Sequence, residues 1–316
     1  MIRLHGQPIR VVPPAAALAL AAALLAAVLV AAGVIAWVAG AGVTLAFGMG
    51  VVGGVPAATS EATLAVRVLT GLLLAAGALG GSLTSSSPWE SAALVIVLAL
   101  AQGRLTVNAS GIAVFAPVIA AVFASVDVIG HPALIALGVI LGYAFVQLLS
   151  VVMRLPRRAS AVEPRMAWLH AAVFAVLAGP AVLVTRSLEV GHGYWLLLTL
   201  AVVLQPAPGV ARAVALARMA GTVSGVVVAI VMVAVLPAPL LVLAAAACLL
   251  LSVGWGISAD VGRSAHYGVL AILFLGSGGS LATGVDLGIE RLVLTGAAVV
   301  LAIAASAVLE RIERSS

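Results

Sequence analysis

The stretch that decides the fold is residues 15–37, AAALALAAALLAAVLVAAGVIAW, a run without a charged side chain. A helix needs about 20 apolar residues to cross the hydrocarbon core of a bilayer, and this run is long enough to do so. It also exceeds the roughly 7 to 15 apolar residues found in a signal peptide. We therefore interpret it as the first transmembrane helix and not as a cleaved leader.

The rest of the chain has the same character. Hydrophobic residues make up 64% of the 316 residues and charged residues only 8%, whereas charged residues make up about a quarter of a typical soluble domain. Apolar runs recur along the whole chain, separated by short breaks that contain Gly, Pro, Ser or Arg. No segment is long and polar enough to form a soluble domain, so the composition predicts an all-α, polytopic transmembrane helical bundle.

Twelve apolar segments can be delimited, in two sets of six. They predict two tandem six-helix repeats, at 1–153 and 167–316, joined by a basic cytoplasmic linker at 154–166. Three and four residues after Arg67 stand Thr and Gly, and at the same distances after Arg218 stand Gly and Thr. The two arginines are 151 positions apart, and the match between the two motifs supports a duplication. The segments are 15–37, 39–55, 62–83, 89–103, 108–128, 131–153, 167–188, 193–205, 209–236, 238–255, 264–281 and 288–309.

The arginines predict the orientation in the membrane, since cytoplasmic loops keep the positive charge. The chain has 15 Arg and no Lys, and with twelve spans and a cytoplasmic N-terminus only Arg186 and Arg291 fall outside. If the short segments 39–55 and 193–205 did not span, the basic linker would lie outside, so the charge rule favours six spans in each half. We expect a multi-pass protein of the inner (plasma) membrane with both termini in the cytoplasm.

The most informative pattern lies between residues 194 and 225. In order, it contains Tyr194, Trp195, Thr199, Gln205, Pro206, Arg212, Arg218, Gly221, Thr222 and Gly225. This order resembles the signature of the fusaric acid resistance-like family of aromatic-acid exporters, and the later Arg291 with Thr295 and Gly296 is similar to the last helix of that family. The resemblance implies a helical membrane protein that exports aromatic or other organic acids. The first half lacks the Tyr-Trp and Gln-Pro elements, which indicates a diverged copy.

Two interpretations of this pattern stay open. The helix that contains Arg218 places its Arg, Gly and Thr residues on one face, which forms either a substrate path, with Arg attracting a carboxylate, or a close helix contact, with Arg218 reaching the headgroups. Tyr194 and Trp195 either stack on an aromatic ligand or belong to the outer aromatic belt. The short segments 39–55 and 193–205 hold matching places in the two halves, as discontinuous helices around a midplane site do. The predicted substrate path comprises Arg67, Thr70, Tyr194, Trp195, Thr199, Gln205, Arg212, Arg218, Thr222 and Arg291.

A second polar cluster is a candidate proton relay. Asp260, Arg263, His266 and Tyr267 follow one another at helical spacing near the cytoplasmic side, and histidine is the side chain that titrates nearest neutral pH. The alternative is a simple ion pair between Asp260 and Arg263, with His266 at the start of a helix. His170, alone in the seventh apolar segment, is expected to hydrogen-bond within the bundle.

Several functional classes are disfavoured by what the sequence lacks. Without Lys there is neither a Walker-type phosphate loop nor a Schiff-base lysine. The single Cys248 forms no intrachain disulfide, and the five His show no metal-ligand spacing. We therefore expect no enzyme, no cofactor, no metal site and no nucleic-acid partner. The expected partners are the lipid bilayer and a small organic anion, with a homo-oligomer also compatible with the sequence.

Three functions remain under consideration. The first is a secondary transporter that exports aromatic or other organic acids, coupled to the proton gradient. The second is an organic-anion channel, in which the two fused halves surround one pore. The third is a non-transporting membrane scaffold subunit, which the scarcity of intramembrane charge would allow.

Overall fold

The computed structural model describes residues 12–107, 114–126, 130–155, 157, 162–204 and 208–314. Within these residues the chain forms eleven helices and no strand, which confirms the predicted all-α class. The helices are α1 (Ala15–Ala58), α2 (Leu64–Leu83), α3 (Pro88–Thr106), α4 (Phe115–Ser125), α5 (Pro132–Val152), α6 (Pro164–Ser187), α7 (Tyr194–Val203), α8 (Pro208–Val235), α9 (Ala238–Ile257), α10 (Val261–Gly276) and α11 (Leu281–Arg314).

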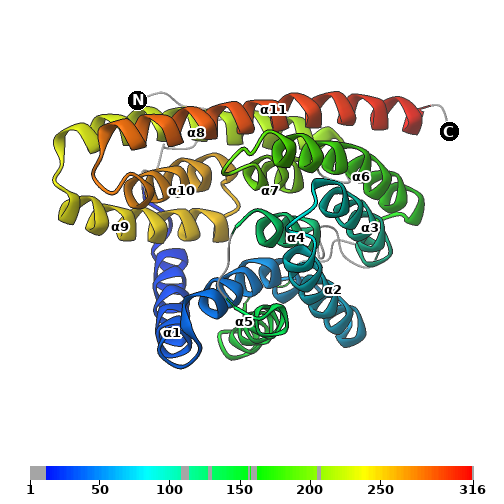
Figure 1. Cartoon of the computed structure of the whole chain (residues 1–316), viewed down its shortest axis with the longest axis horizontal. Helices are drawn as coiled ribbons and strands as arrows, with labels where there is room; N and C mark the ends of the chain where they lie inside the picture. The colour runs from blue at the N-terminus through cyan, green and yellow to red at the C-terminus, as the bar shows by residue number, and fades with distance from the viewer. Residues whose placement is uncertain are drawn as a thin grey trace. The chain divides into compact units, whose positions relative to one another are not determined.

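Each of the twelve predicted segments coincides with helical structure, and the first two share α1. The break predicted between them lies at Gly40, whose backbone has φ 83° and ψ 176°. This positive φ is readily adopted only by glycine, because a Cβ atom would clash with the backbone. Gly40 therefore separates two helical parts of α1, and the bend between them is visible at the bottom of Figure 1.

Seven helices are long and apolar enough to cross a membrane: α1, α2, α5, α6, α8, α9 and α11. By contrast α4, α7 and α10 have 11, 10 and 16 residues. The short α7 agrees with the partial helix considered for 193–205, whereas α4 is much shorter than the predicted segment 108–128. An 11-residue helix is about 16 Å long and does not cross a bilayer by itself. The arrangement of twelve spans in two repeats stays a prediction.

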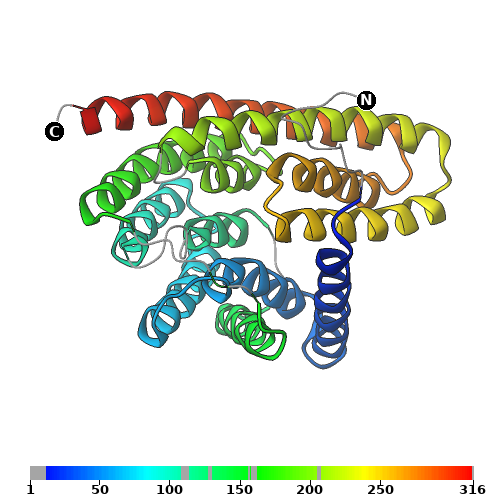
Figure 2. The same ribbon diagram turned by 180° about the vertical axis from the view of Figure 1, so that it is seen from behind.

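The chain divides into two compact units, each built from separate stretches of sequence. Unit 1 comprises Met1–Ala27 and Leu216–Val293, and unit 2 comprises Val28–Ala215 and Leu294–Ser316. In unit 1 a core of Val233, Leu241 and Leu273 joins α8, α9 and α10, and α9 and α10 lie side by side in both views (Figures 1 and 2). In unit 2 α2 packs on α3, α4 and α5, and α6 packs on α3.

Glycines make the closest helix contacts in unit 2. A Cβ atom at Gly77 of α2 would lie 2.6 Å from the carbonyl oxygen of Ala116 on α4, and one at Gly81 would overlap the carbonyl oxygen of Ala120. From the first contact to the second, the position on α2 and the position on α4 each increase by four residues, so the two helices run parallel. Small residues in this spacing let two backbones approach closely, as in lipid-embedded helix pairs.

Unit 1 repeats this contact with different residues. On α8, a Cβ atom at Gly221 would overlap the carbonyl oxygen of Gly262, and one at Gly225 would lie 2.8 Å from the carbonyl oxygen of His266 on α10. Here too the two helices run parallel and the contact advances by four residues. The packing interpretation of Gly221 and Gly225 is thus confirmed.

The remaining helix pairs alternate in direction. The hydroxyl of Ser252 on α9 donates to the carbonyl of Ser264 on α10 at 2.8 Å, and Ser264 donates back to the carbonyl of Ser252 at 2.9 Å. Gly103 of α3 faces Ala171 of α6, while Gly179 further along α6 faces the earlier Ile96. Gly256, which follows Ser252 on α9, also faces Ser264, and Gly268, which follows Ser264 on α10, faces Ser252. In both pairs one helix advances as the other recedes, so α9 and α10, and likewise α3 and α6, are antiparallel.

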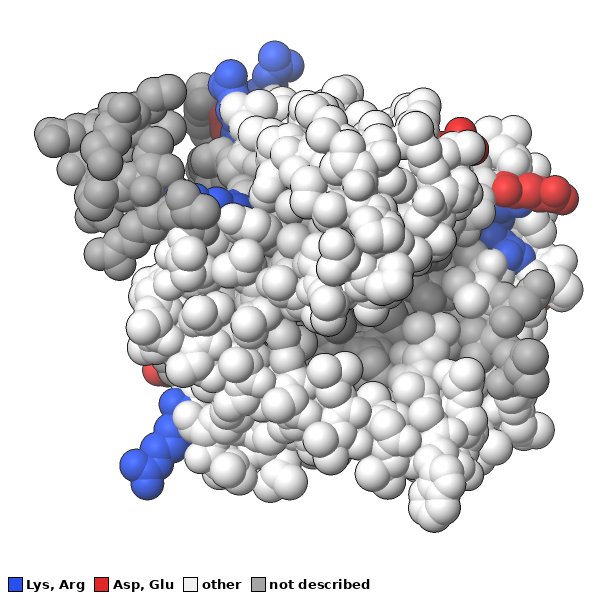
Figure 3. All heavy atoms as spheres, turned by 90° about the vertical axis from the view of Figure 1, so that its left-hand side faces the viewer, with Lys and Arg blue, Asp and Glu red and all other residues white. Residues whose placement is uncertain are grey.

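The surface of the molecule suits a lipid environment. Large apolar side chains are exposed along most helices, among them Trp37, which is 88% exposed, and Leu29 and Val30 beside it on α1. Figure 3 shows a face that is almost free of charged side chains, with the few Arg, Asp and Glu side chains at its edges. Exposed apolar area on this scale is unfavourable in water and favourable in a hydrocarbon phase.

Candidate functional site

Arg218 stands out among the predicted site residues of unit 1. It lies on α8 one turn before Gly221, close to the point where α8 meets the start of α10. Its Nε atom is buried and has no hydrogen-bond partner in the described structure. The guanidinium group only donates hydrogen bonds, so this Nε–H has donor capacity that no acceptor among the described residues uses. Thr222, one turn further on, is also buried.

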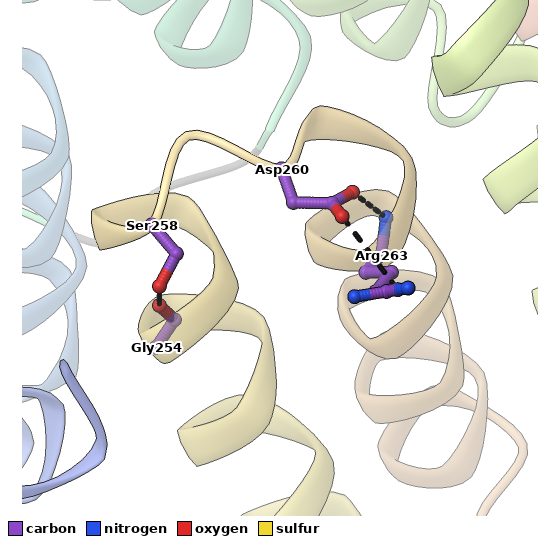
Figure 4. Close-up of polar contacts among 4 residues, drawn as sticks. All are labelled: Gly254, Ser258, Asp260 and Arg263. Atoms are coloured by element: carbon purple, nitrogen blue, oxygen red, sulfur yellow. Dashed lines mark hydrogen bonds and ion pairs between the residues drawn. The ribbon is translucent and has the colours of Figure 1, made fainter. Parts of the chain in front are cut away.

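The start of α10 is held by an ion pair. The Asp260 carboxylate accepts a 2.9 Å hydrogen bond from the main-chain N–H of Arg263 and lies 3.6 Å from the Nε atom of Arg263, as Figure 4 shows. Asp260 is thereby the N-cap of α10, a position that carboxylates favour because they complement the helix dipole. In the same view Ser258 donates to the carbonyl of Gly254 at the end of α9. This geometry fits the ion-pair alternative for Asp260 and Arg263.

The other two members of the predicted relay lie further along α10. The Nδ1 atom of His266 is 2.8 Å from the hydroxyl of Ser224 on α8, and its ring meets the ring of Tyr267 edge-on at 5.0 Å. The Arg263 guanidinium lies 4.3 Å from the centre of the Trp255 ring, a cation–π contact. The structure thus places the four residues on one helix, with His266 directed to α8; proton transfer along them stays a prediction.

Arg291 is the most deeply buried arginine of the predicted path. Only 4% of its surface is exposed on α11, which is unusual for a residue that is nearly always charged. A buried guanidinium is retained only where other groups compensate its charge. Arg291 is therefore a buried charged residue of α11, in the stretch of this helix that belongs to unit 1.

In unit 2 the two aromatic residues of the signature differ in exposure, since Trp195 is buried and Tyr194 is half-buried. Trp195 is only 5% exposed, and its ring stacks on His192 at 4.3 Å. Tyr194 meets the ring of His192 edge-on at 6.1 Å. The aromatic-belt interpretation is wrong for Trp195, because a belt residue has to reach the membrane surface. Thr199, one turn further on α7, is fully buried and its hydroxyl has no hydrogen-bond partner in the described structure.

Arg67 and Thr70, by contrast, are engaged with nearby backbone. Arg67 donates from Nε to the carbonyl of Ala62 at 3.1 Å and from its terminal nitrogen to the carbonyl of Ser60 at 2.7 Å. Thr70 donates to the carbonyl of Val66, one turn earlier on α2, at 2.8 Å. Arg67 therefore closes the turn that joins α1 and α2, and its contacts differ from those of Arg218.

The last two residues of the predicted path differ in what can be said of them. Arg212 is exposed on α8, where it is available to a ligand or a headgroup. Gln205 lies outside the described residues. In the part of the chain that the structure describes, no group of three His, Cys, Asp or Glu side chains could hold a metal ion.

Two further polar residues of unit 2 are buried, and the sequence analysis singled out only His170. Gln102 on α3 is fully buried, and neither its amide nitrogen nor its amide oxygen has a partner in the described structure. His170 on α6 bonds the carbonyl of Leu204, 34 residues away, which confirms the expected bond within the bundle. The sequence shows each only as a lone polar residue in an apolar helix, a signal that does not reveal its partner.

Comparison with known proteins agrees with the signature. Residues 177–305 match the family model described as fusaric acid resistance protein-like. The predicted resemblance to the fusaric acid resistance protein-like family is confirmed over these residues. No curated protein and no solved structure matches the chain. The match covers Arg218, Thr222 and Arg291, and together with the apolar helices it indicates a multi-pass, transport-related membrane protein.

Proposed function

We propose that the protein is a secondary membrane transporter that exports aromatic or other organic acids in exchange for protons. The observation that carries this proposal is the buried Nε–H of Arg218, which has no acceptor in the part of the chain that the structure describes and lies on a helix within the match to the fusaric acid resistance protein-like family. In a medium of low dielectric constant such a group attracts a carboxylate much more strongly than it would in water. Acid export would supply an acceptor for the buried Nε–H of Arg218, which donates to no acceptor within the described residues.

The residues predicted for the substrate path differ in the chemistry that each would supply. Arg218 and Arg291 supply positive charge, Thr199 and Thr222 supply buried hydroxyl groups, and Arg212 lies exposed before Arg218 on the same helix. Asp260, Arg263, His266 and Tyr267 are proposed as a proton relay on the cytoplasmic side, where exchanged protons leave the protein. Carboxylate recognition by arginine and a hydroxyl group is a common chemical solution for anion pathways.

The packing also supports two tandem halves with alternating helices. The glycines of α2 on α4 and of α8 on α10 make the same parallel, four-residue contact. Two other pairs are antiparallel. Helix α3 runs opposite to α6, and α9 runs opposite to α10. Twelve segments that cross the membrane one after another would alternate in direction in this way. We further propose, from the distribution of arginines, that both termini lie in the cytoplasm and that the membrane is the inner membrane.

Reconstitution into liposomes tests the proposed function. Liposomes containing the protein would be given radiolabelled phthalate, an aromatic dicarboxylate that crosses bare bilayers slowly. Movement of phthalate across the liposome membrane would be measured with and without a pH gradient. Accumulation against the phthalate gradient that stops when the pH gradient is collapsed supports proton-coupled export. Flux that follows only the electrochemical gradient of the anion would make the protein a channel, and the absence of flux for a panel of organic acids would favour the scaffold.

Arg218 provides the matched variants. Arg218→Ala should abolish flux while the protein still inserts and remains monodisperse in detergent, and Arg218→Lys should restore flux only in part because Lys lacks the planar donor geometry. Arg311→Ala, an exposed arginine on α11 outside the proposed path, is the control and should transport normally. Normal export by Arg218→Ala would refute the proposed anion path.

A further inference from the structure

The end of α7 depends on a side chain of α6. The carbonyl of Leu204, the residue that follows α7, would normally accept a hydrogen bond from the N–H of residue 208 if the helix continued. Residue 208 is proline and has no N–H. His170 occupies this carbonyl instead, with its Nε2 atom 2.7 Å from the oxygen. The histidine therefore completes the end of the discontinuous helix.

This contact determines which ring nitrogen of His170 carries the proton. A carbonyl oxygen only accepts hydrogen bonds, so Nε2 must be the N–H donor and the neutral imidazole has its lone pair on Nδ1. The Nδ1 atom is buried and has no partner in the described structure, and His170 is only 1% exposed. A proton can therefore bind Nδ1 without breaking the bond to Leu204.

Three helices that pack against α6 are α3, α4 and α7, and they carry few charged side chains. Helix α4 has no titratable side chain, and α7 has only Tyr194. On α3, Arg104 lies near the level of His170, because Gly103 faces Ala171, whereas Glu90 is more than three turns away, about 20 Å along the helix. On α6 itself the charged residues are Arg165 and Arg186.

No carboxylate of these helices thus lies close to Nδ1 along their length. The neighbouring helices instead offer neutral polar groups that have no partner among the described residues, the amide of Gln102 on α3 and the hydroxyl of Thr199 on α7. Three helices that pack together therefore each bury a polar side chain with unused hydrogen-bonding capacity. Such groups are uncommon in a protein interior and require an explanation.

We propose that Nδ1 of His170 is the buried proton-binding site that couples the pH gradient to transport. The inference rests on the proposed function and adds to it the group that carries the proton. On protonation the imidazolium keeps its Nε2–H bond to Leu204 and strengthens it, because a charged donor makes a stronger hydrogen bond. Proton binding is thereby transmitted to the end of α7, the helix that carries Trp195 and Thr199.

Transport by two variants separates proton binding from support of α7. His170→Gln retains an N–H donor for the Leu204 carbonyl but takes up no proton, whereas His170→Ala loses both properties. His170→Gln should exchange phthalate across liposomes at equal concentrations and lose accumulation driven by the pH gradient. His131→Gln is the control, since His131 caps α5 at an exposed position. Gradient-driven accumulation by His170→Gln at the wild-type level would overturn the proposal.

A direct reading of the proton is independent of transport. Solid-state NMR would be recorded on liposomes that contain the protein with ring-¹⁵N-labelled histidine. At high pH the wild type should show the signal of an imidazole with a protonated Nε2 and an unprotonated Nδ1, and this signal should be missing from the spectrum of His170→Gln. Lowering the pH from about 8 to about 5, across the range in which histidine normally titrates, should protonate this Nδ1. The proposal would be refuted if Nδ1 of His170 stayed unprotonated at low pH, or if the neutral ring carried its proton on Nδ1. If the wild type shows this titration but no gradient-driven flux, the proposed export function fails while the proton site stands.

Discussion

The hydroxyl of Tyr143 on α5 donates a 2.6 Å hydrogen bond to the main-chain carbonyl of Arg67 on α2, 76 residues earlier in the sequence. Its ring packs over Gly71, where a Cβ atom would lie only 2.9 Å from two ring carbons. The bond fixes the start of α2 against α5, and the missing Cβ makes room for the ring. Arg67 is thus held through its backbone by Tyr143 and through its side chain by the turn before α2.

Removing the Tyr143 hydroxyl tests this contact. Tyr143→Phe should lower the free energy of unfolding in detergent by about 1 kcal/mol, the usual net value of one hydrogen bond. Gly71→Ala should cost more, because its methyl group meets the ring. Leu148→Ala on the exposed side of α5 is the control. Equal stabilities of wild type and Tyr143→Phe would show that the bond contributes nothing.

Arg67→Ala should act on stability. The substitution removes the hydrogen bonds from the guanidinium to the carbonyls of Ser60 and Ala62, and hydrogen bonds from charged donors contribute about 1.5 to 3 kcal/mol each at most. We expect a lower unfolding temperature and a lower yield, with Arg67→Lys restoring part of both. The measurement is thermal unfolding followed by size-exclusion chromatography in detergent. An Arg67→Ala protein as stable as the wild type but inactive would instead support its place in the substrate path.

The glycines that contact carbonyls should tolerate no methyl group. Gly81→Ala and Gly225→Ala should each destabilise the protein by about 1 to 3 kcal/mol, the usual cost of overpacking. Similar values are expected because the two glycines make equivalent contacts in the two units. Gly48→Ala is the matched control, since nothing lies within 4 Å of its Cβ position, and the helix propensity of Ala should make it neutral or stabilising.

The positions of the helices could be predicted from the sequence because a membrane helix imposes a long apolar run and its ends collect Gly, Pro and Arg. Gly40 and the prolines after Leu204 mark breaks that the structure contains. The faces of the helices could not be predicted, since nearly every face is apolar and no stripe distinguishes the interior from the lipid side. For this reason the burial of Trp195 and the bond from His170 to Leu204 emerged only from tertiary packing.

The register of the predicted duplication shows the same limit. Sequence matching pairs Arg67 with Arg218 at an offset of 151, whereas the equivalent contacts pair Gly77 with Gly221 and Gly81 with Gly225, at an offset of 144. In the packing register Arg67 falls one residue from Arg212. Chains rich in Ala, Leu and Val align in many registers, but a glycine facing a carbonyl is specific to one position. Arg218 then has no arginine counterpart in the first half, in agreement with a specific role in the second.

The reciprocal serine pair of α9 and α10 gives a last test. Each hydroxyl donates to the main-chain carbonyl of the other residue, so replacing one serine by alanine leaves the bond made by the other in place. Interhelical hydrogen bonds in membranes contribute about 0.6 kcal/mol on average. Ser252→Ala and Ser264→Ala should therefore each cost about that amount, and the double variant should cost the sum. Ser82→Ala, whose hydroxyl bonds only its own helix at Ala78, is the control. A coupling energy above about 1 kcal/mol would mean that the two hydroxyl groups act on each other and not on the backbone.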